Sequence, residues 1–436
     1  MAVLYSIGLY TLGCKVSQYE TEAVAELFEA RGFCRQSFDE VSDVYVINTC
    51  TVTAESDAKS RKFIRRAVKM NPEAVVCVMG CYSQRAANEV ASIDGVSAVI
   101  GTENKTKLPE IVEKIFSGEY EKPYVLTTDV SAAEFEPMCI TRAPRTRAYV
   151  KIEDGCESKC TYCAIKEARG RVRSKPREDV ISEVEALAGC GVGEIVLTGI
   201  ETASYGRDFN TGYTLSHLLR ELDERKSCAR IRLGSLAPEL VGEAFAESVR
   251  DLKILAPHFH ISVQSGSDNV LRSMKRRYNA KTALENIERL RNYIPRATFT
   301  TDLMVGFPGE TEADFQETVD FARKARFLDA HVFAYSRRDG TPAAEYDLQI
   351  PEDEKARRSR ILIEECKKIR DAVLDEIVNR GEPLSCILET KKDGWFTAHS
   401  DTYAEVLVEA SEKHQGEIVK VLPVLNKSGV IYGKLV

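Results

Sequence analysis

The sequence lacks a long hydrophobic segment, a signal peptide and internal repeats. No apolar run approaches the roughly 18 residues that a membrane-spanning helix needs, so we expect no membrane segment. The N-terminus has neither a basic region nor a cleavage site, which argues against a secretory signal. The protein is therefore expected to be cytoplasmic, with no membrane among its partners.

The composition is that of a globular protein of several domains that is rich in cysteine. A chain of 436 residues is long enough for about two to three domains. Hydrophobic residues make up 44% and charged residues 29% of the chain, as is typical of soluble proteins. Its 13 cysteines favour metal and thiol chemistry in a reducing compartment over disulfides. The net charge is −7, so binding of a polyanion must depend on a local basic patch.

Three cysteines lie close together in the segment Cys156-Glu157-Ser158-Lys159-Cys160-Thr161-Tyr162-Cys163. Thiolates in such tight loops hold iron–sulfur clusters. A structural zinc site needs four ligands, and the next candidates, Cys190 and His217, are distant in the sequence. Three ligands therefore favour a [4Fe–4S] cluster with one iron open to another molecule, with zinc or a chance grouping of cysteines as the alternatives.

Strand and helix patterns alternate from residue 1 to about residue 120, which predicts a parallel sheet with flanking helices. Three cysteines, Cys14, Cys50 and Cys81, each follow a predicted strand. Because the carboxyl ends of parallel strands lie at one edge, this topology predicts a second three-thiolate site. The alternative is that these cysteines are small core residues. The predicted strands are Val3–Leu12, Val44–Asn48, Ala74–Met79 and Ala98–Ile100, and the predicted helices are 17–31, 54–70, 84–92 and 104–117.

Basic residues concentrate in two places. Within the predicted helix 54–70, Lys59, Lys62, Arg66 and Lys69 share one face, which indicates either a phosphate-binding stripe or a solvated surface. Between Arg142 and Arg177 there are eleven basic and four acidic residues. A basic surface beside a reactive cluster favours a polyanionic substrate, although some of these arginines are alternatively expected to anchor cofactors.

The sequence after residue 120 predicts a linker, an α/β region and a C-terminal β region. Residues 121–144 contain three prolines and are interpreted as a linker. Six strand-and-helix units then predict a partial barrel, whose chemistry lies at the carboxyl ends of its strands. After a long charged helix at 352–380, short strands predict a small C-terminal β-barrel. The barrel strands are predicted at Tyr149–Ile152, Glu194–Thr198, Arg230–Ser235, His258–Val263, Thr298–Val305 and His331–Tyr335, and the C-terminal strands at Leu384–Glu389, Tyr403–Val408, Glu417–Val424 and Val430–Val436.

These motifs resemble the radical S-adenosylmethionine (SAM) superfamily and, within it, the methylthiotransferases. The resemblance rests on the C-x3-C-x2-C loop with Tyr162 between its last two cysteines, and on the flanking motifs Asp154-Gly155, Ala168–Ser174, Tyr10–Val16, Asn48–Thr53 and Met79–Tyr82. It implies an N-terminal methylthiotransferase domain at 1–120, a linker at 121–144, a radical SAM domain at 145–373, and a β-barrel like the RNA-binding TRAM domain at 374–436. For that last barrel, which has seven basic and ten acidic residues over 375–436, the alternative is a structural cap.

The resemblance also implies two [4Fe–4S] clusters and SAM as cofactors. Cys156, Cys160 and Cys163 would hold the radical SAM cluster, and Cys14, Cys50 and Cys81 the second cluster. No catalytic residue is expected beyond these ligands and the groups around SAM. The SAM-binding residues implied are Tyr162, Gly199, Glu201, Ser235, Gln264 and Val305, and the RNA-binding residues are Arg169, Arg171, Arg173, Lys62 and Arg66.

The motifs Ala168–Ser174 and Asn48–Thr53, followed by Ser56-Asp57, are most similar to one branch of this family. That branch methylthiolates carbon 2 of N6-threonylcarbamoyladenosine at position 37, in the anticodon stem-loop of tRNA. One SAM molecule would donate the methyl group and a second would yield the 5′-deoxyadenosyl radical. The sister branches, which act on isopentenyl-adenosine or on a ribosomal-protein aspartate, remain alternatives, as does a non-catalytic RNA-binding protein.

The substrate of this branch contains a carboxylate, and burying an unpaired carboxylate is costly. Arginine is suited to grip a carboxylate through two parallel hydrogen bonds, and Arg169, Arg171, Arg173 and Arg232 are the candidates. The resemblance further implies a one-electron donor such as flavodoxin or ferredoxin, and we expect a monomer.

Overall fold

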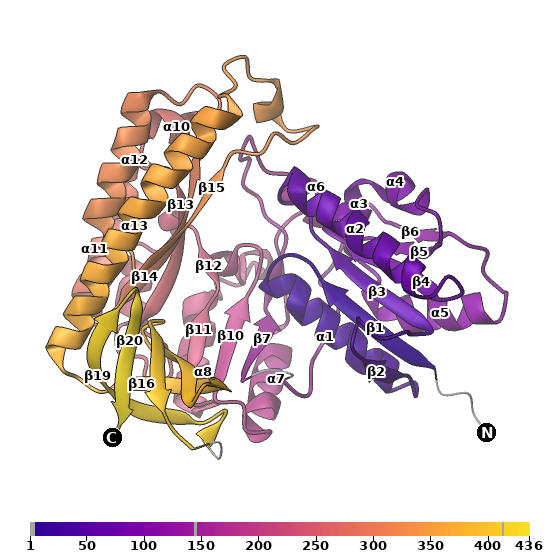
Figure 1. Ribbon diagram of the computed structural model, residues 1–436, viewed down its shortest axis with the longest axis horizontal. Helices are drawn as coiled ribbons and strands as arrows, with labels where there is room; N and C mark the ends of the chain where they lie inside the picture. Colours follow the sequence, from indigo (N-terminus) through magenta and orange to yellow (C-terminus); the bar gives the residue numbers. More distant parts are fainter. Residues whose placement is uncertain (1–4, 144–145, 412–413) are drawn as a thin grey trace. The chain divides into compact units, whose positions relative to one another are not determined.

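A computed structural model describes residues 5–143, 146–411 and 414–436. The chain forms two compact units (Figure 1). The first contains Met1–Thr141, Tyr149–Pro176 and Ser336–Ala344, and the second contains Arg142–Ala148, Arg177–Tyr335 and Glu345–Val436. The cysteine-rich loop thus belongs to the same unit as the N-terminal region. The domain boundaries given above stay predictions, and the predicted strand start at Val3 and the residues Pro144 and Arg145 lie outside the described residues.

The first unit is built on a parallel sheet, as predicted, but with six strands instead of the predicted four. Its strand order is β2-β1-β3-β4-β5-β6, and every pairing is parallel. The two central strands are buried along their whole length, whereas the three-residue edge strands β2 and β6 are partly exposed and were not predicted. The strands are β1 (Ser6–Thr11), β2 (Cys34–Gln36), β3 (Val44–Thr49), β4 (Val75–Gly80), β5 (Val96–Ile100) and β6 (Tyr124–Leu126).

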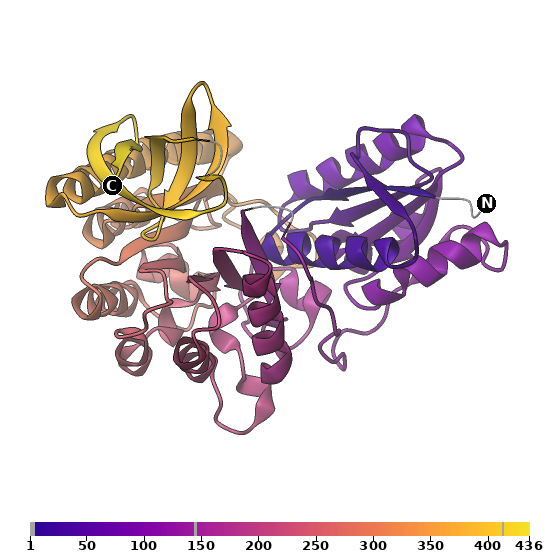
Figure 2. The same cartoon turned by 90° about the horizontal axis from the view of Figure 1, so that it is seen from below.

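Helices cover both faces of this sheet (Figure 2). On one face, Ile64 and Ala67 of α2 pack with Tyr45, Ile47 and Val76 in one apolar cluster. Alternate residues of β3 point to the opposite face because strand side chains alternate. The helices are α1 (Lys15–Glu29), α2 (Ala54–Met70), α3 (Cys81–Arg85), α4 (Ala87–Ala91), the 3₁₀ turn η1 (Lys105–Lys107) and α5 (Leu108–Phe116), so the helix predicted at 84–92 is divided.

The cysteine-rich loop is framed by short elements of the first unit. Strand β8 (Glu153–Asp154) pairs with β9 (Arg173–Ser174) in the antiparallel sense. The chain between them contains the three cysteines and α6 (Ile165–Arg169). The pairing therefore closes the loop at its base. Gly155 and Gly170 lie within the loop, between the two strands.

The second unit contains the remaining strands of the predicted barrel in two sheets. One has the order β11-β10-β7, where Arg147 and Ala148 of β7 (Arg147–Lys151) belong to this unit, and the other has the order β12-β13-β14-β15. The six predicted strand regions are thereby confirmed. The elements are α7 (Arg177–Gly189), β10 (Glu194–Thr198), η2 (Thr202–Ser204), η3 (Arg207–Phe209), α8 (Leu215–Arg225), β11 (Ile231–Leu233), β12 (Ser235–Leu236), η4 (Pro238–Leu240), α9 (Glu243–Val249), β13 (His258–Gln264), α10 (Asp268–Ser273), α11 (Ala280–Tyr293), β14 (Thr298–Val305), α12 (Glu312–Ala325) and β15 (Asp329–Ala334). The 3₁₀ turn η5 (Pro342–Glu345) lies in the first unit except for its last residue.

A closed five-stranded barrel follows the long helix α13 (Glu352–Arg380) at the C-terminus. Leu374 and Ile377 of α13 pack into the barrel core with Phe396, Val406 and Ile431. The predicted small barrel is confirmed, but its second strand was not predicted. Its strands, in the order β16-β17-β18-β20-β19, are β16 (Leu384–Lys392), β17 (Trp395–Ser400), β18 (Glu405–Glu409), β19 (Ile418–Lys427) and β20 (Val430–Leu435). Among the described helices, none is long and apolar enough to cross a membrane.

Candidate functional site

Cys14, Cys50 and Cys81 lie at the carboxyl ends of three adjacent parallel strands. Cys14 precedes α1, Cys50 directly follows β3, and Cys81 directly follows β4. A Cβ added to Gly13, whose φ is +113°, would lie 3.3 Å from the Sγ of Cys50. Burial, and then the nearness of the Cys81 and Cys14 thiols, raises the pKa of Cys50 to about 11. The three thiols therefore influence one another at one sheet edge, and their role as cluster ligands stays a prediction.

Cys156, Cys160 and Cys163 are half-exposed and lie in a loop shaped by backbone hydrogen bonds. The Cys156 N–H donates to the Gly170 carbonyl at 3.0 Å. The Ser158 N–H donates to the Sγ of Cys156, and the Ile165 N–H donates to the Sγ of Cys163, both at 3.4 Å. Donors of this kind stabilise sulfur in its negatively charged form.

Gly155 is required for this loop to form. Its φ is +85°, and an added Cβ would lie 1.8 Å from the Arg171 carbonyl oxygen. Only glycine fits such a close backbone approach in this conformation. The sequence motif Asp154-Gly155 is thus explained by the turn that leads into Cys156.

The residues of the two cysteine sets fit iron–sulfur ligation in their chemistry. Each set offers three thiols, and all six are free cysteines in the structure. Thiolates are the usual protein ligands of such clusters. Among the described residues, no three Cys, His, Asp or Glu side chains are arranged to hold a single metal ion.

Four of the predicted SAM-binding residues follow or end strands of the second unit. Gly199 and Glu201 follow β10, Gln264 ends β13 with φ +69°, and Val305 ends β14. Ser235 begins β12, and the nearby Ala237 N–H donates to the Glu201 carboxylate at 3.0 Å. Tyr162 is half-exposed in the loop of the first unit. The strand-end positions agree with a ligand-binding edge, and the individual SAM contacts stay predictions.

Glu201 has an altered acidity. Burial raises the pKa of its carboxyl to about 7, and the hydrogen bond from Ala237 only partly opposes this effect. A carboxyl poised in this way loses its proton readily when a cation binds beside it.

Two of the predicted RNA-binding arginines are buried instead. The side chain of Arg169 is fully buried, and that of Arg173 is almost fully buried. Arg169 pairs with Glu20 at 2.5 Å and Asp154 at 3.1 Å, and Arg173 pairs with Glu103 at 2.7 Å. Guanidinium groups held in this way are not available to RNA phosphates, so the prediction is wrong for these two residues. It was misled because a basic run in a sequence does not reveal distant carboxylate partners.

Arg232 is not available for the substrate carboxylate either. It is buried on β11, where it pairs with Glu194 at 2.8 Å and donates to the Ser400 and Asp401 carbonyls. It thereby joins a barrel strand to the C-terminal β-barrel. Arg171, in contrast, is exposed and has no ion-pair partner among the described residues.

The basic stripe on α2 is exposed, which agrees equally with a phosphate-binding stripe and with a solvated surface. Lys62 has no partner within the described part of the chain, whereas Arg66 pairs with Asp39 at 2.6 Å and lies over the Phe38 ring. Arg65 and Lys69 are also exposed. Their contact with RNA stays a prediction.

Sequence reasoning missed the acidic residue at the centre of the buried ion pairs in the first unit. Glu20 is fully buried on α1 and pairs with Arg169, Lys151 and Lys105. The sequence holds a weak signal, because Glu20 has Val16 and Val24 one turn away on either side, in the buried face of the helix.

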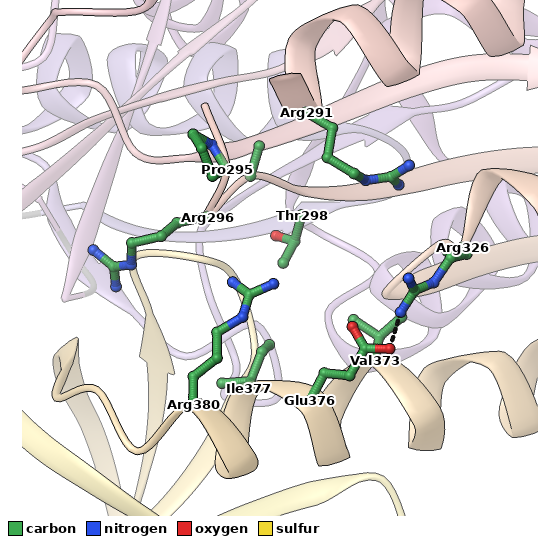
Figure 3. A pocket seen from close by; sticks show the side chains of 10 residues that line it. Arg291, Pro295, Arg296, Thr298, Arg326, Val373, Glu376, Ile377 and Arg380 are labelled. Atoms are coloured by element: carbon green, nitrogen blue, oxygen red, sulfur yellow. Dashed lines mark hydrogen bonds and ion pairs between the residues drawn. The ribbon is translucent and has the colours of Figure 1, made fainter. Parts of the chain in front are cut away.

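A small cavity of about 60 Å³ lies in the second unit near the start of β14. Figure 3 shows the guanidinium groups around it, among them those of Arg296, Arg326 and Arg380, and the ion pair between Arg326 and Glu376. This end of the strands is opposite to the carboxyl ends, where barrels of this kind place their chemistry.

Comparisons with known proteins give similar relatives over most of the chain. A model described as the radical SAM superfamily matches residues 150–322, and one described as uncharacterized protein family UPF0004 matches residues 6–101. The threonylcarbamoyladenosine tRNA methylthiotransferase MtaB of Bacillus subtilis is 38% identical, over 95% of this chain and 93% of that protein. The protein of the same name from Thermotoga maritima is 36% identical, over 84% and 82%.

Two further similarities extend this comparison. The tRNA-2-methylthio-N(6)-dimethylallyladenosine synthase of Carboxydothermus hydrogenoformans is 33% identical, over 95% of this chain and 96% of that protein. The solved structure of the radical SAM methyltransferase TsrM from Kitasatospora setae superposes with a TM-score of 0.58, at 15% identity, over 78% of this chain and 75% of that one. At this identity the structural likeness shows a shared fold alone.

Proposed function

Because the chain belongs to the radical SAM methylthiotransferase family, we propose that it methylthiolates carbon 2 of N6-threonylcarbamoyladenosine at position 37 of tRNA. The observation that supports this most is the 38% identity to the Bacillus subtilis enzyme of that name over nearly the whole of both chains. The relative named for dimethylallyladenosine is 33% identical, so isopentenyl-adenosine is the substrate that an experiment must exclude.

The proposed cofactors are SAM and two [4Fe–4S] clusters, one on each cysteine set. Cys156, Cys160 and Cys163 would hold the loop cluster, which would supply one electron to SAM, and Cys14, Cys50 and Cys81 would hold the second cluster, which would take part in sulfur transfer. The burial of Cys50 and Cys81 supports this division, because it shields two of the three thiols of the second set from water.

Side chains of the chain itself bind and orient SAM. Glu201 is proposed to accept a hydrogen bond from the ammonium group of the methionine moiety, and Tyr162 is proposed to lie against the adenine. The pKa of about 7 at Glu201 supports its part, since an arriving cation favours the ionised carboxylate and is then held by a charged hydrogen bond. Gly199, which follows β10, is proposed to leave room for the ligand. Gln264 and Val305 end β13 and β14, and Ser235 begins β12.

The tRNA contacts are proposed for α2 and the region after the cysteine loop. Lys59, Lys62, Arg66 and Lys69 form an exposed stripe on α2, with Arg65 exposed beside it. Arg171 is exposed after α6. Each phosphate contact adds close to one unit to the slope of log affinity against log salt. Changing Lys62 and Lys69 to Ala together is expected to flatten that slope by roughly one to two units. Lys107→Ala serves as control, because Lys107 is exposed and has no ion-pair partner among the residues that the structure describes.

Arg171 is proposed to pair with the carboxylate of the threonylcarbamoyl group. It is the remaining candidate among the four predicted arginines, because Arg169, Arg173 and Arg232 are buried in other ion pairs. Loss of such a charged hydrogen bond is expected to cost roughly 2–5 kcal/mol of discrimination.

The deciding experiment is a single-turnover assay on two tRNAs that differ only at position 37. Reconstituted protein is given tRNA with threonylcarbamoyl-adenosine or tRNA with isopentenyl-adenosine, and nucleosides are measured by mass spectrometry. We expect the 2-methylthio product from the first tRNA. Arg171→Ala should lower the yield from this tRNA more than the yield from the isopentenyl tRNA, and the control Lys107→Ala should lower neither. Equal or better conversion of the isopentenyl tRNA would place the protein in the sister branch.

We further propose that the protein acts as a monomer in the cytoplasm and receives its electron from flavodoxin or ferredoxin. The free thiols of all 13 cysteines support a reducing compartment.

A further inference from the structure

Arg169 contacts both a strand-end cysteine and the segment that leads into the cysteine loop. Its Nε donates to the Sγ of Cys81 at 3.2 Å. Its terminal nitrogens donate to both carboxylate oxygens of Glu20, at 2.5 and 3.1 Å, and to Asp154 at 3.1 Å. Arg169 itself lies on α6, six residues after Cys163. One guanidinium therefore touches the thiol of Cys81, one of the strand-end cysteines, and belongs to the segment that contains Cys156, Cys160 and Cys163.

The groups around Arg169 hold it in one orientation. Lys151 pairs with Glu20 at 2.8 Å and with Asp154 at 2.6 Å, so both carboxylates are gripped from two sides. Arg173 donates to the Arg169 carbonyl at 2.6 Å. All of these side chains are buried, and breaking such a buried network is costly because it leaves a charge without its partner. The Nε–H is thus aimed at Cys81 by a rigid frame.

We propose that Arg169 is a positioning residue that sets the reduction potential of the second cluster through its N–H···S bond to Cys81. The inference rests on the proposed function, because it requires Cys81 to be a cluster ligand. A charged donor stabilises negative charge on a sulfur, and a reduced cluster has one more negative charge than an oxidised one. Hydrogen bonds to the sulfurs are one of the ways in which proteins tune cluster potentials. The bond therefore favours the reduced form and makes the potential less negative.

The test isolates the second cluster in the full-length chain. Cys156, Cys160 and Cys163 are all changed to Ala, and the protein is reconstituted anaerobically and titrated potentiometrically with EPR detection. Arg169→Lys is then added, because lysine keeps the positive charge but cannot hold two carboxylates and aim an N–H at sulfur at once. Arg173→Lys is the matched control, since it makes the same change at a buried arginine of the same network for which no sulfur contact is found among the described residues.

We expect Arg169→Lys to shift the midpoint potential to a more negative value, and Arg173→Lys to leave it unchanged. The same potential in all three proteins, or the same shift in both arginine variants, would overturn the inference while leaving the second cluster in place. A background protein that binds no iron would overturn both the inference and the proposed second cluster.

A second measurement needs no change at Arg169 and so does not depend on the folding of that variant. The background protein is labelled with ¹⁵N-arginine, and the reduced cluster is examined by pulsed EPR. We expect a hyperfine coupling from an arginine nitrogen, which a merely structural arginine remote from the sulfur would not give. A reduced cluster without any such coupling would contradict the proposal.

Discussion

The two cysteine sets of the first unit are held by different means. Cys14, Cys50 and Cys81 come from the ends of separate strands, and two of them are buried. Cys156, Cys160 and Cys163 come from one short loop and are half-exposed. A parallel sheet brings the first set together over long sequence distances, whereas local backbone hydrogen bonds and one glycine shape the second.

This difference matches the different tasks proposed for the two sets. An exposed loop leaves one side of a bound cluster open to SAM, as the three-cysteine spacing predicts. A buried sheet edge gives a fixed environment in which a neighbouring arginine acts on a sulfur. The ion pairs of Glu20, Arg169 and Asp154 connect the helix after Cys14 with the segment before Cys156, so the two sets are expected to depend on one frame.

Removing each cysteine set is expected to have the largest effect. Protein with all six cysteines should bind about eight iron and eight sulfide after anaerobic reconstitution, if each set holds one four-iron cluster. Changing Cys156, Cys160 and Cys163 to Ala should leave about four iron and abolish SAM cleavage. Changing Cys14, Cys50 and Cys81 to Ala should also leave about four iron but spare SAM cleavage.

The measurements are iron and sulfide assays and the yield of 5′-deoxyadenosine with a chemical reductant. Cys77→Ala is the matched control, because Cys77 is buried within β4 rather than at its end, and it should retain both clusters. Full iron retention in the strand-end variant would mean that this set consists of core residues only. A loss of SAM cleavage in both triple variants would contradict the proposal that only the loop cluster is needed to cleave SAM.

The next largest effect is expected from Glu20→Gln, which breaks the frame shared by both sets. Removing one partner of a buried ion pair costs about 3–5 kcal/mol. Glu22→Gln on the same helix is the control, because its ion pair with Arg35 at 2.6 Å is partly exposed and is worth about 0–1 kcal/mol. Urea unfolding at pH 7 measures the free energies of unfolding of the two variants. An equally small loss of stability in both would contradict the central role of Glu20.

The pH dependence of the Glu20 effect has a defined sign. Arg169, Lys105 and Lys151 outweigh the effect of burial and hold the pKa of Glu20 well below its usual value. A depressed pKa means that its stabilisation is fully present above the unfolded-state pKa, about 4.3, decreases below it, and is lost only as the pH falls through the lower folded-state pKa. The free energies of unfolding of the original and Glu20→Gln proteins should therefore begin to converge below about pH 4 and meet only at a pH below the folded-state pKa.

The effect of Gly155→Ala is expected to be smaller and confined to the loop set. A positive φ costs a residue with a Cβ about 1–3 kcal/mol, and the new Cβ would meet the Arg171 carbonyl oxygen. Gly118→Ala is the control, because Gly118 has φ +75° but no atom within 4 Å of an added Cβ. We expect Gly155→Ala to lower iron binding in the loop more than Gly118→Ala does. Equal iron binding in the two variants would mean that the close approach to the Arg171 carbonyl oxygen does not limit this position.

How far the sequence predicted the molecule follows from the range of the interactions involved. The sheet and barrel strands were predicted because their hydrophobic patterns are local, and the strand-end cysteines followed from them. The short strands β2, β6 and β17 were missed because three to six partly buried residues give little pattern. The burial of Arg169 was missed because its partner Glu20 is 149 residues away, and no local signal pairs them.

The smallest effect is expected from Glu167→Gln, which removes an exposed link between the two cysteine sets. Arg85, on the helix that begins with Cys81, pairs with Glu167 on α6 at 3.0 Å, and the Glu167 side chain is 53% exposed. Such pairs are worth about 0.2–1 kcal/mol, and Arg85 keeps its hydrogen bond to the Asp339 carbonyl. Because the Debye length falls from about 10 Å at 0.1 M salt to about 3 Å at 1 M, the loss should largely vanish at high salt. The buried Glu20→Gln loss should persist there. Denaturant unfolding of both variants at the two salt concentrations checks this contrast, and a Glu167→Gln loss as large and salt-independent as that of Glu20→Gln would mean that the exposed link also belongs to the frame.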